Sequence, residues 1–315
     1  MRLPRHHSFA LIPLVLLGAC VQQDRDDSPV LSTISNTDQD DEAWTSELAE
    51  HRESIDERLR SSDSSPMAGS QYLKSEPGDH VSLNRHEKTF ALAESPGPET
   101  VLLVTKTEGT WYWHDQGQGV VCRVEDELVP TGEALEGAAM FEIGSLFSSF
   151  YPSEDRVTFI VFDPDREEMR SFDHLLYFPP DREYAVNARL IMLPDPDEIE
   201  MLTSRDLKKT FYRYAKIEFQ LAGEAHELSA FKSDLAGEGS GQLFIPFRDA
   251  TTGRETYGAG RFLEIEEPTE EHFILDFNRA FNPLCNYSPA YNCAIPPREN
   301  HLEVAIKAGE MTYPH

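Results

Sequence analysis

Basic side chains are scarce in this chain of 315 residues, which has 28 Lys and Arg against 56 Asp and Glu and a formal net charge of −28. Phosphate binding requires clustered Lys and Arg, so this balance excludes nucleic acid as a partner. Electrostatic attraction to anionic lipid is excluded on the same ground. Two acids for each base are typical either of adaptation to high salt, where a hydrated acidic surface preserves solubility, or of an acidic protein from a mesophile.

The common catalytic signatures are also missing. The sequence has no phosphate-binding loop, no dinucleotide fingerprint and no helix with paired histidines for zinc. The glycine-rich run 237–241 lacks the spacing of a nucleophile elbow and is typical of a flexible loop. Two Asp-Pro-Asp sequences, 163–165 and 195–197, lack the glycine and distal glutamate of a calcium loop and indicate turns. The absence of these motifs predicts no cofactor and no metal, and it favours a non-enzymatic protein.

A long apolar run, residues 9–17, lies close to the first residue. Arg2 and Arg5 precede the run, and small residues up to Cys20 close it. A positive end, an apolar stretch too short to span a bilayer, small residues and a cysteine resemble a bacterial lipoprotein signal peptide. The resemblance implies that residues 1–19 are removed and that Cys20 becomes the lipidated first residue. The alternative, an ordinary secretory signal with an incidental cysteine, also exports the protein.

The segment after this signal is predicted to be a tether. Export leaves 26 basic and 56 acidic side chains, a net charge of −30. Residues 20–41 hold few large apolar side chains, so we expect a disordered acidic segment, with membrane contact through the lipid anchor alone. Val21 lacks the acidic character that retains enterobacterial lipoproteins at the inner membrane. The expected location is therefore the cell envelope, at the outer membrane facing the periplasm rather than at the inner membrane.

An amphipathic helix is predicted to follow the tether, starting at residue 42. Four apolar residues recur at spacings of 4, 7 and 4 and share one helix face, namely Trp44, Leu48, Ile55 and Leu59. This stripe is expected to pack on the domain that follows it, and the alternative is a partner-binding helix. The serine-rich run 61–66 ends in proline and ends the helix.

The rest of the chain predicts short strands. β-Branched, aromatic or alternating apolar residues mark strands at 101–105, 110–114, 120–124, 157–162, 184–190, 217–221, 228–231 and 302–306. Trp111 and Trp113 share one strand face. They are expected to fill the core, and stacking on a sugar ring is the alternative.

We predict a mainly β protein with two antiparallel β modules, each a sandwich or open barrel, preceded by one amphipathic helix. The helix and the amino-terminal module span residues 42–165, and the carboxyl-terminal module spans residues 166–315. The join lies in the acid-rich turn 163–168. Many short strands with one good helix argue against an alternating α/β enzyme.

Several multi-residue blocks in the carboxyl-terminal third carry a family resemblance. In chain order they are 176–186, 243–253, 255–262, 275–283 and 296–302, with Cys285 and Cys293 between the last two. They resemble the bacterial and archaeal family called domain of unknown function 1684, over about residues 170–310. That family has no settled activity, so the resemblance implies no catalytic residues. Its upstream half sometimes resembles a forkhead-associated sandwich, but residues 77–86 do not cleanly show the spacing that holds a phosphothreonine.

Polar side chains are dense in this family-like region, and each one that is buried needs a partner. One interpretation is a pocket in which Arg261 or Arg279 holds an anionic group while Asp276 and asparagines orient it. The other is an internal network of salt bridges and hydrogen bonds that pins irregular loops to the sheet. The candidate pocket residues are Tyr257, Arg261, Asp276, Asn278, Arg279, Asn282, Glu299 and Asn300, and Asp249 lies among them.

Cysteine usage predicts one disulfide. Cys285 and Cys293 are separated by seven residues, and an exported protein enters a compartment that oxidises thiols. A zinc site that recruits His301 is the alternative. Cys122 lies in an apolar strand and is expected to be buried and inert.

The sequence thus predicts an exported, lipid-anchored envelope protein. The favoured hypothesis is a non-enzymatic module that binds a small molecule or an envelope protein near Arg261, Asp276 and Asn282. The alternative is a hydrolase-type enzyme that uses Asp276 and Glu299 as acid and base. An open concave site containing both carboxyls would favour the enzyme, and a wide separation would argue against it.

Overall fold

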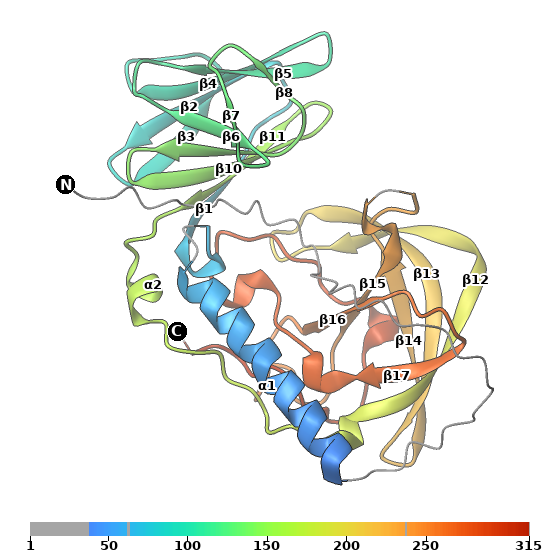
Figure 1. Ribbon diagram of the computed structural model, residues 1–315. Helices are drawn as coiled ribbons and strands as arrows, with labels where there is room; N and C mark the ends of the chain where they lie inside the picture. Colours follow the sequence, from blue (N-terminus) through green and yellow to red (C-terminus); the bar gives the residue numbers. More distant parts are fainter. Residues whose placement is uncertain (1–37, 62–63, 237, 315) are drawn as a thin grey trace, which may run out of the picture.

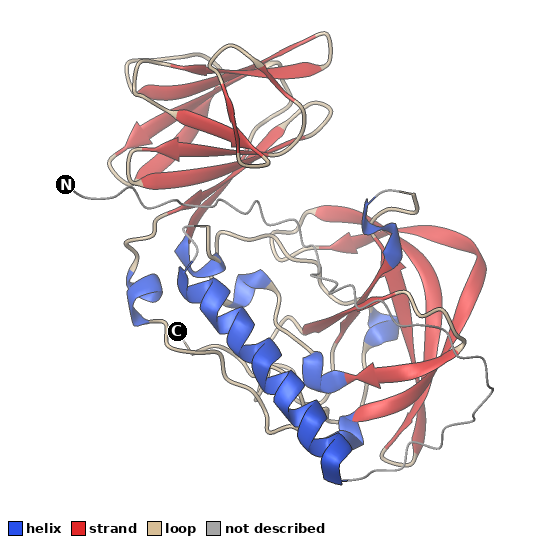
Figure 2. Ribbon diagram, in the orientation of Figure 1, coloured by secondary structure: helices blue, strands red, loops and turns tan. Residues whose placement is uncertain are grey.

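The computed structural model describes residues 38–61, 64–236 and 238–314. The predicted signal peptide, Cys20 and the predicted tether as far as residue 37 lie outside the described residues. Among the helices of the described part, none has the length and apolar character needed to cross a membrane. The secondary structure is mainly β, with antiparallel sheets in two modules, as the sequence predicts (Figure 2).

Strands β1 to β11 form the amino-terminal sandwich, residues 69–162, in which two antiparallel sheets face each other (Figure 1). Their strand orders are β1-β11-β10-β9-β6-β7 and β3-β2-β4-β5-β8. The two segments through which the chain enters and leaves the sandwich lie side by side. The N–H of Asp163 donates to the carbonyl of Ala68 at 2.8 Å. The strands are β1 (Gly69–Lys74), β2 (His80–His86), β3 (Thr89–Ala93), β4 (Thr100–Thr107), β5 (Thr110–Asp115), β6 (Val121–Val124), β7 (Glu127–Val129), β8 (Ala134–Leu135), β9 (Ala139–Ile143), β10 (Leu146–Pro152) and β11 (Val157–Phe162).

Both tryptophans of β5 lie in the core of this sandwich. Trp111 and Trp113 are 4% and 2% exposed. Their rings contact Phe150 and Phe141, with centroids 6.4 Å and 5.6 Å apart. The prediction that they fill the core is confirmed. Cys122 is buried in the same core, and burial raises the pKa of its thiol to about 12, which makes it unreactive.

The carboxyl-terminal module, residues 166–314, is built on one antiparallel sheet of order β16-β15-β14-β13-β12-β17. The long strands β12 and β13 form a curved hairpin around the module's apolar core (Figure 1). Ala222 and Gly223 join β13 to β14 with φ of 54° and 81°, the backbone that a tight hairpin turn requires. The elements are α2 (Glu167–Ser171), β12 (Ala185–Leu202), β13 (Lys208–Leu221), β14 (Glu224–Lys232), β15 (Gln242–Phe247), β16 (Arg261–Glu266) and β17 (His272–Asp276).

The predicted strand at 302–306 is wrong. Its alternating apolar side chains do pack on the core, but the backbone forms no strand. The N–H of Leu302 donates to the carbonyl of Arg248 at 2.8 Å, and the N–H of Ile306 donates to the carboxylate of Asp249 at 2.7 Å. A loop and a side chain satisfy these backbone groups, so the alternation reflects contact with the core and not membership of a sheet.

Helix α1 (Asp38–Ser61) begins four residues before the predicted start at residue 42. It lies along the carboxyl-terminal module, and its last turn reaches the base of β1 (Figure 1). Ile55 and Leu59 pack with Phe172 and Tyr287 of that module. The expectation that the stripe packs on the domain directly after it is therefore wrong. Short 3₁₀ turns complete the fold: η1 (Pro66–Ala68), η2 (Arg182–Tyr184), η3 (Glu238–Gly241), η4 (Phe277–Arg279), η5 (Leu284–Asn286) and η6 (Arg298–Asn300).

The loop closed by Cys285 and Cys293, here called the disulfide loop, joins the two modules. Ala290 and Tyr291 of the loop pack with Met140 and Phe162 of the sandwich and with Ala68, which directly precedes β1. Nearby, the hydroxyl of Ser288 donates to the carbonyl of Gly69 at 2.7 Å. The sandwich is therefore held to the carboxyl-terminal module by this loop as well as by its two covalent connections.

Candidate functional site

Arg261 is an internal anchor of the carboxyl-terminal module. Arg261 is 1% exposed, although it is the first residue of strand β16. The guanidinium donates to the carboxylate of Asp249 at 3.3 Å, to the carbonyl of Ile306 at 2.8 Å and to the carbonyl of Ala308. Burial lowers the pKa of Arg261, and the charge of Asp249 opposes that effect. Because the two terminal nitrogens of the guanidinium face oxygen atoms of the chain itself, Arg261 holds the segment 306–310 in place, and its Nε is buried without a partner among the described residues.

Asp249 completes this network from the turn after β15. Its carboxylate accepts hydrogen bonds from the hydroxyls of Thr251 at 2.8 Å and Thr252 at 3.0 Å, besides those from Arg261 and the N–H of Ile306. The side chains of Asp249 and Arg261 are both 0% exposed. These donors satisfy the buried carboxylate of Asp249, which thereby orders the turn after β15.

Asn282 belongs to a neighbouring network around Glu310, a residue that sequence analysis missed. The amide of Asn282 and the hydroxyl of Tyr287 donate to the Glu310 carboxylate at 2.7 Å and 2.6 Å. Glu310 is 1% exposed. Burial raises its pKa to about 7, although the hydrogen bonds from Tyr287 and Asn282 act in the opposite direction. No local motif marks Glu310, because its partners come from 23 to 28 positions earlier in the chain.

Asp276, Asn278 and Arg279 lie where α1 meets the carboxyl-terminal module. The indole N–H of Trp44 donates to the Asp276 carboxylate at 3.0 Å, and the N–H of Asn278 donates to the same carboxylate at 2.9 Å. Arg279 pairs with Glu47 of α1 at 2.6 Å. Asp276 and Arg279 therefore fasten the helix, and Asn278 orders the turn that carries them.

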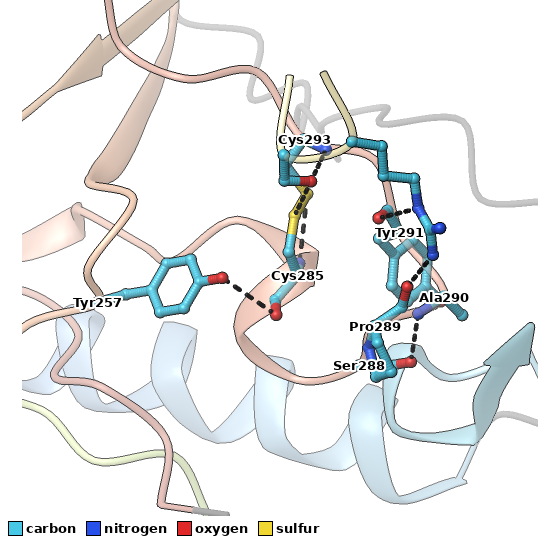
Figure 3. The surroundings of a disulfide bond; sticks show 9 residues. Tyr257, Cys285, Ser288, Pro289, Ala290, Tyr291 and Cys293 are labelled. Carbon is cyan, nitrogen blue, oxygen red and sulfur yellow. Dashed lines mark hydrogen bonds between the residues drawn. A yellow bond between two sulfur atoms is a disulfide. The ribbon is translucent and has the colours of Figure 1, made fainter. Parts of the chain in front are cut away.

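Tyr257 lies beside the disulfide loop, and its hydroxyl donates to the carbonyl of Cys285 at 3.3 Å (Figure 3). The Cys285–Cys293 disulfide is present, as predicted. His301 contacts the carbonyl of Pro296 and not a cysteine. Within the described ranges, no group of three or more His, Cys, Asp and Glu residues is arranged to hold a metal ion.

Glu299 and Asn300 are neighbours in the chain but have separate partners. Glu299 pairs with Arg213 of β13 at 2.6 Å. Partial burial works to raise the pKa of Glu299, but the hydrogen bond and charge of Arg213 outweigh burial and lower it. Asn300 is fully buried, accepts the N–H of Ser229 at 2.7 Å and donates to the carbonyl of Pro246 at 2.7 Å. Asn300 thus pins its loop to β14 and β15.

The structure does not bring Asp276 and Glu299 together. Asp276 is opposite Ala185 at the start of β12, whereas Arg213, the partner of Glu299, is opposite Asp197. Residues 185 and 197 are 12 positions apart, about 40 Å of extended strand. Instead of one concave site, the eight candidate residues form separate networks at the tail, at α1, at the disulfide loop and on β13 to β15.

Two open depressions lie on the described surface of the carboxyl-terminal module. One, of about 300 Å³, is lined by Arg248, Asp249 and His301 among others. The second, of about 490 Å³, is lined by Gly241, Gln242, Glu266, Glu267, Pro268 and Thr269. None of the eight candidate pocket residues lines either depression.

These features define a class: a mainly β protein of two antiparallel modules, in which buried polar networks hold the irregular carboxyl-terminal segments. The chain belongs to the family described as "Protein of unknown function (DUF1684)", whose model matches residues 170–311. A solution NMR structure of the uncharacterized protein from gene locus rrnAC0354 of Haloarcula marismortui is 39% identical, covers 48% of this chain and 83% of its own, and has a TM-score of 0.40. A comparison with curated proteins finds no match. Helix α1 and the sandwich lie outside the matched residues.

Proposed function

We propose that this protein is a lipid-anchored component of the cell envelope, attached through Cys20, that acts as a non-enzymatic binding or support module. In this proposal its partners contact the sandwich, which is held away from the membrane. The anchor hypothesis comes from the sequence. The placement of the modules supports the orientation.

The observation that carries the orientation is the course of α1. Its 24 residues extend about 36 Å along the carboxyl-terminal module. The Asp38 end lies far from the sandwich, and the Ser61 end lies next to β1 (Figure 1). A tether that joins the membrane to Asp38 therefore attaches to one pole of the molecule, and the sandwich projects from the other.

The hydrogen bonds of the candidate residues support a binding or support module over an enzyme. Arg261, Asp276 and Asn282 have partners within the chain and stabilise its loops and helix. Asp276 contacts Trp44 of α1 and Glu299 contacts Arg213 of β13, and these different partners argue against an acid and base pair. No observation favours the hydrolase hypothesis over the binding module.

Membrane fractionation with acyl labelling tests the anchor. Cys20→Ala should move the protein to the soluble fraction and abolish labelling, because no other lipid site is proposed. Cys122→Ala is the matched control, since Cys122 is buried and should not affect partitioning. If the Cys20→Ala protein remains with the membrane, the anchor is wrong.

Energy transfer to labelled lipid headgroups tests the orientation. Fluorophores are attached to the anchored protein at Glu42→Cys, near the start of α1, or at Leu128→Cys, which is 62% exposed in the sandwich. The buried thiol of Cys122 should not react. Transfer should be stronger from position 42, and equal or stronger transfer from position 128 would contradict the orientation.

A further inference from the structure

One face of the curved sheet carries a row of side chains that lies outside the networks described above. The register places Phe244 opposite Phe231 on one side and opposite Glu264 on the other. Gln242 is likewise opposite Glu266. Directly opposed residues of antiparallel strands share a face, and so do residues two positions apart. Gln242, Phe244, Glu264 and Glu266 therefore form one surface on β15 and β16.

The curl of the sheet brings β13 to the same surface. The ring of Phe211 stacks on that of Phe244 with centroids 5.3 Å apart and planes at 20°. The ammonium of Lys209, two positions earlier on the same face, lies 5.4 Å from the centroid of Phe211. Phe211 is buried, Phe244 is half-buried, and Lys209 is exposed. The accessible part is thus a half-buried ring with a lysine at one end and glutamates at the other.

Lys209 and Glu264 are not paired with each other. Neither side chain forms a hydrogen bond or an ion pair within 4 Å with another described residue, although both backbones belong to strand ladders. The surrounding protein atoms partly desolvate Lys209 and lower its pKa, although its side chain reaches solvent, and the charge of Glu264 opposes this effect. Burial also raises the pKa of Glu264 to about 7, against the charge of Lys209. Glu264, which is half-buried, therefore loses more from poor solvation than it gains from Lys209, and a ligand ammonium beside Glu264 would relieve this loss.

A hollow and an unpaired acceptor lie at the glutamate end. The open depression of about 490 Å³ is lined by Gln242 and Glu266, both on this surface. The side-chain oxygen of Gln242 is buried and has no hydrogen-bond partner among the described residues. A buried acceptor without a donor is costly, and it fits a ligand that carries N–H groups.

We propose that this surface binds a small zwitterion of the amino-acid class. The ligand's primary ammonium lies at Glu264 and Gln242, its carboxylate reaches Lys209, and its apolar part rests on Phe244. Charge complementarity selects this occupant: a simple anion meets two glutamates, and a simple cation leaves Lys209 unpaired. A quaternary ammonium would not satisfy Gln242, because it has no N–H. The proposal goes beyond the anchored binding module and does not depend on it.

The test is calorimetric titration of the lipid-free mature chain, residues 20–315 with Cys20→Ala. The probes are L-leucine, n-butylamine as the cation alone, butyrate as the anion alone, and glycine betaine as a zwitterion without N–H. Leucine should bind at least tenfold more tightly than each of the others. Lys209→Met should reduce leucine affinity to that of n-butylamine, and Glu264→Gln should reduce it to that of butyrate.

Lys216→Met and Glu227→Gln are the matched controls, because this exposed pair, 2.8 Å apart on β13 and β14, has its own partner. Neither control should change leucine affinity, and thermal unfolding confirms that each variant is folded. No binding of leucine, or equal loss in the controls, would overturn the proposal. A charge-swapped double variant, Lys209→Glu with Glu264→Lys, should not bind leucine. Its stability should remain below that of the wild type. Full recovery of stability by this swap would mean that the two charges serve only each other.

Discussion

The indole N–H of Trp44 donates to the carboxylate of Asp276 across 3.0 Å of space and 232 positions of sequence. The guanidinium of Arg182 lies over the Trp44 ring, 4.3 Å from the ring centroid. This contact ties the first turns of α1 to the end of β17. The helix is therefore an integral part of the carboxyl-terminal module.

We expect Trp44→Phe to weaken the docking of α1. The variant keeps an aromatic ring under Arg182 but loses a partly buried hydrogen bond to a charged acceptor, a cost of about 1–2 kcal/mol. Hydrogen exchange should become faster along α1 and remain unchanged in the sandwich. Ser54→Ala, at an exposed position of the same helix, is the control. Unchanged exchange along α1 in Trp44→Phe would show that the helix is held by other contacts.

Removal of one partner from the buried Asp249–Arg261 pair should strongly destabilise the fold. Asp249→Ala leaves a guanidinium that is fully buried without its counter-charge, and we expect a loss of about 3–5 kcal/mol in urea unfolding. Glu271→Ala removes the partner of Arg189 in an exposed pair and should leave stability close to that of the wild type. Similar effects of the two substitutions would mean that the charge of Arg261 does not depend on Asp249 for its stability in the fold.

Reduction of the disulfide should loosen the contact between the modules. A disulfide that closes a loop of this length stabilises the fold by about 2.5 kcal/mol through the unfolded chain. The loop also packs on Ala68 and Gly69, so reduction should increase proteolysis at the base of the sandwich. Reductant should have no further effect on the Cys285→Ser, Cys293→Ser double variant. Proteolysis that is the same with and without reductant would contradict this link.

Glu310 predicts a pH dependence of stability. Its pKa is raised from 4.5 to about 7 in the folded state, so the folded chain holds more protons than the unfolded chain between these values. Stability should therefore fall as pH rises from about 4.5 to about 7, by a contribution on the order of 3 kcal/mol. Urea unfolding of the wild type and of Glu310→Gln at several pH values measures this contribution as the difference between the two slopes. Parallel slopes would assign the pH dependence to other acids.

The sequence predicted those features that depend on near neighbours in the chain. Helical spacing placed Ile55 and Leu59 on one face, and strand alternation placed Trp111 and Trp113 in a core. The pairing of Cys285 with Cys293 followed from a short separation and the predicted compartment. In each case the partner lies within a few residues or the pattern repeats with a fixed period.

The features that the sequence did not predict depend on distant partners. Arg261 and Asp276 were recognised as polar groups in need of partners, but spacing could not show that a tail carbonyl and Trp44 would satisfy them. The surface formed by Phe244 and Glu264 requires the register of four strands and the curl of the sheet. The alternation at 302–306 matched a strand, but its hydrogen-bond partners were a loop and a carboxylate.

The side-by-side entry and exit of the chain at Ala68 and Asp163 make the sandwich an inserted domain. The helix before it and the sheet after it belong to one folding unit that is split in the sequence. The sandwich can therefore fold from one continuous stretch of chain, whereas α1 can dock only when Asp276, more than 200 positions later, is in place. Until then the amphipathic helix has no partner, and its apolar face is open to solvent.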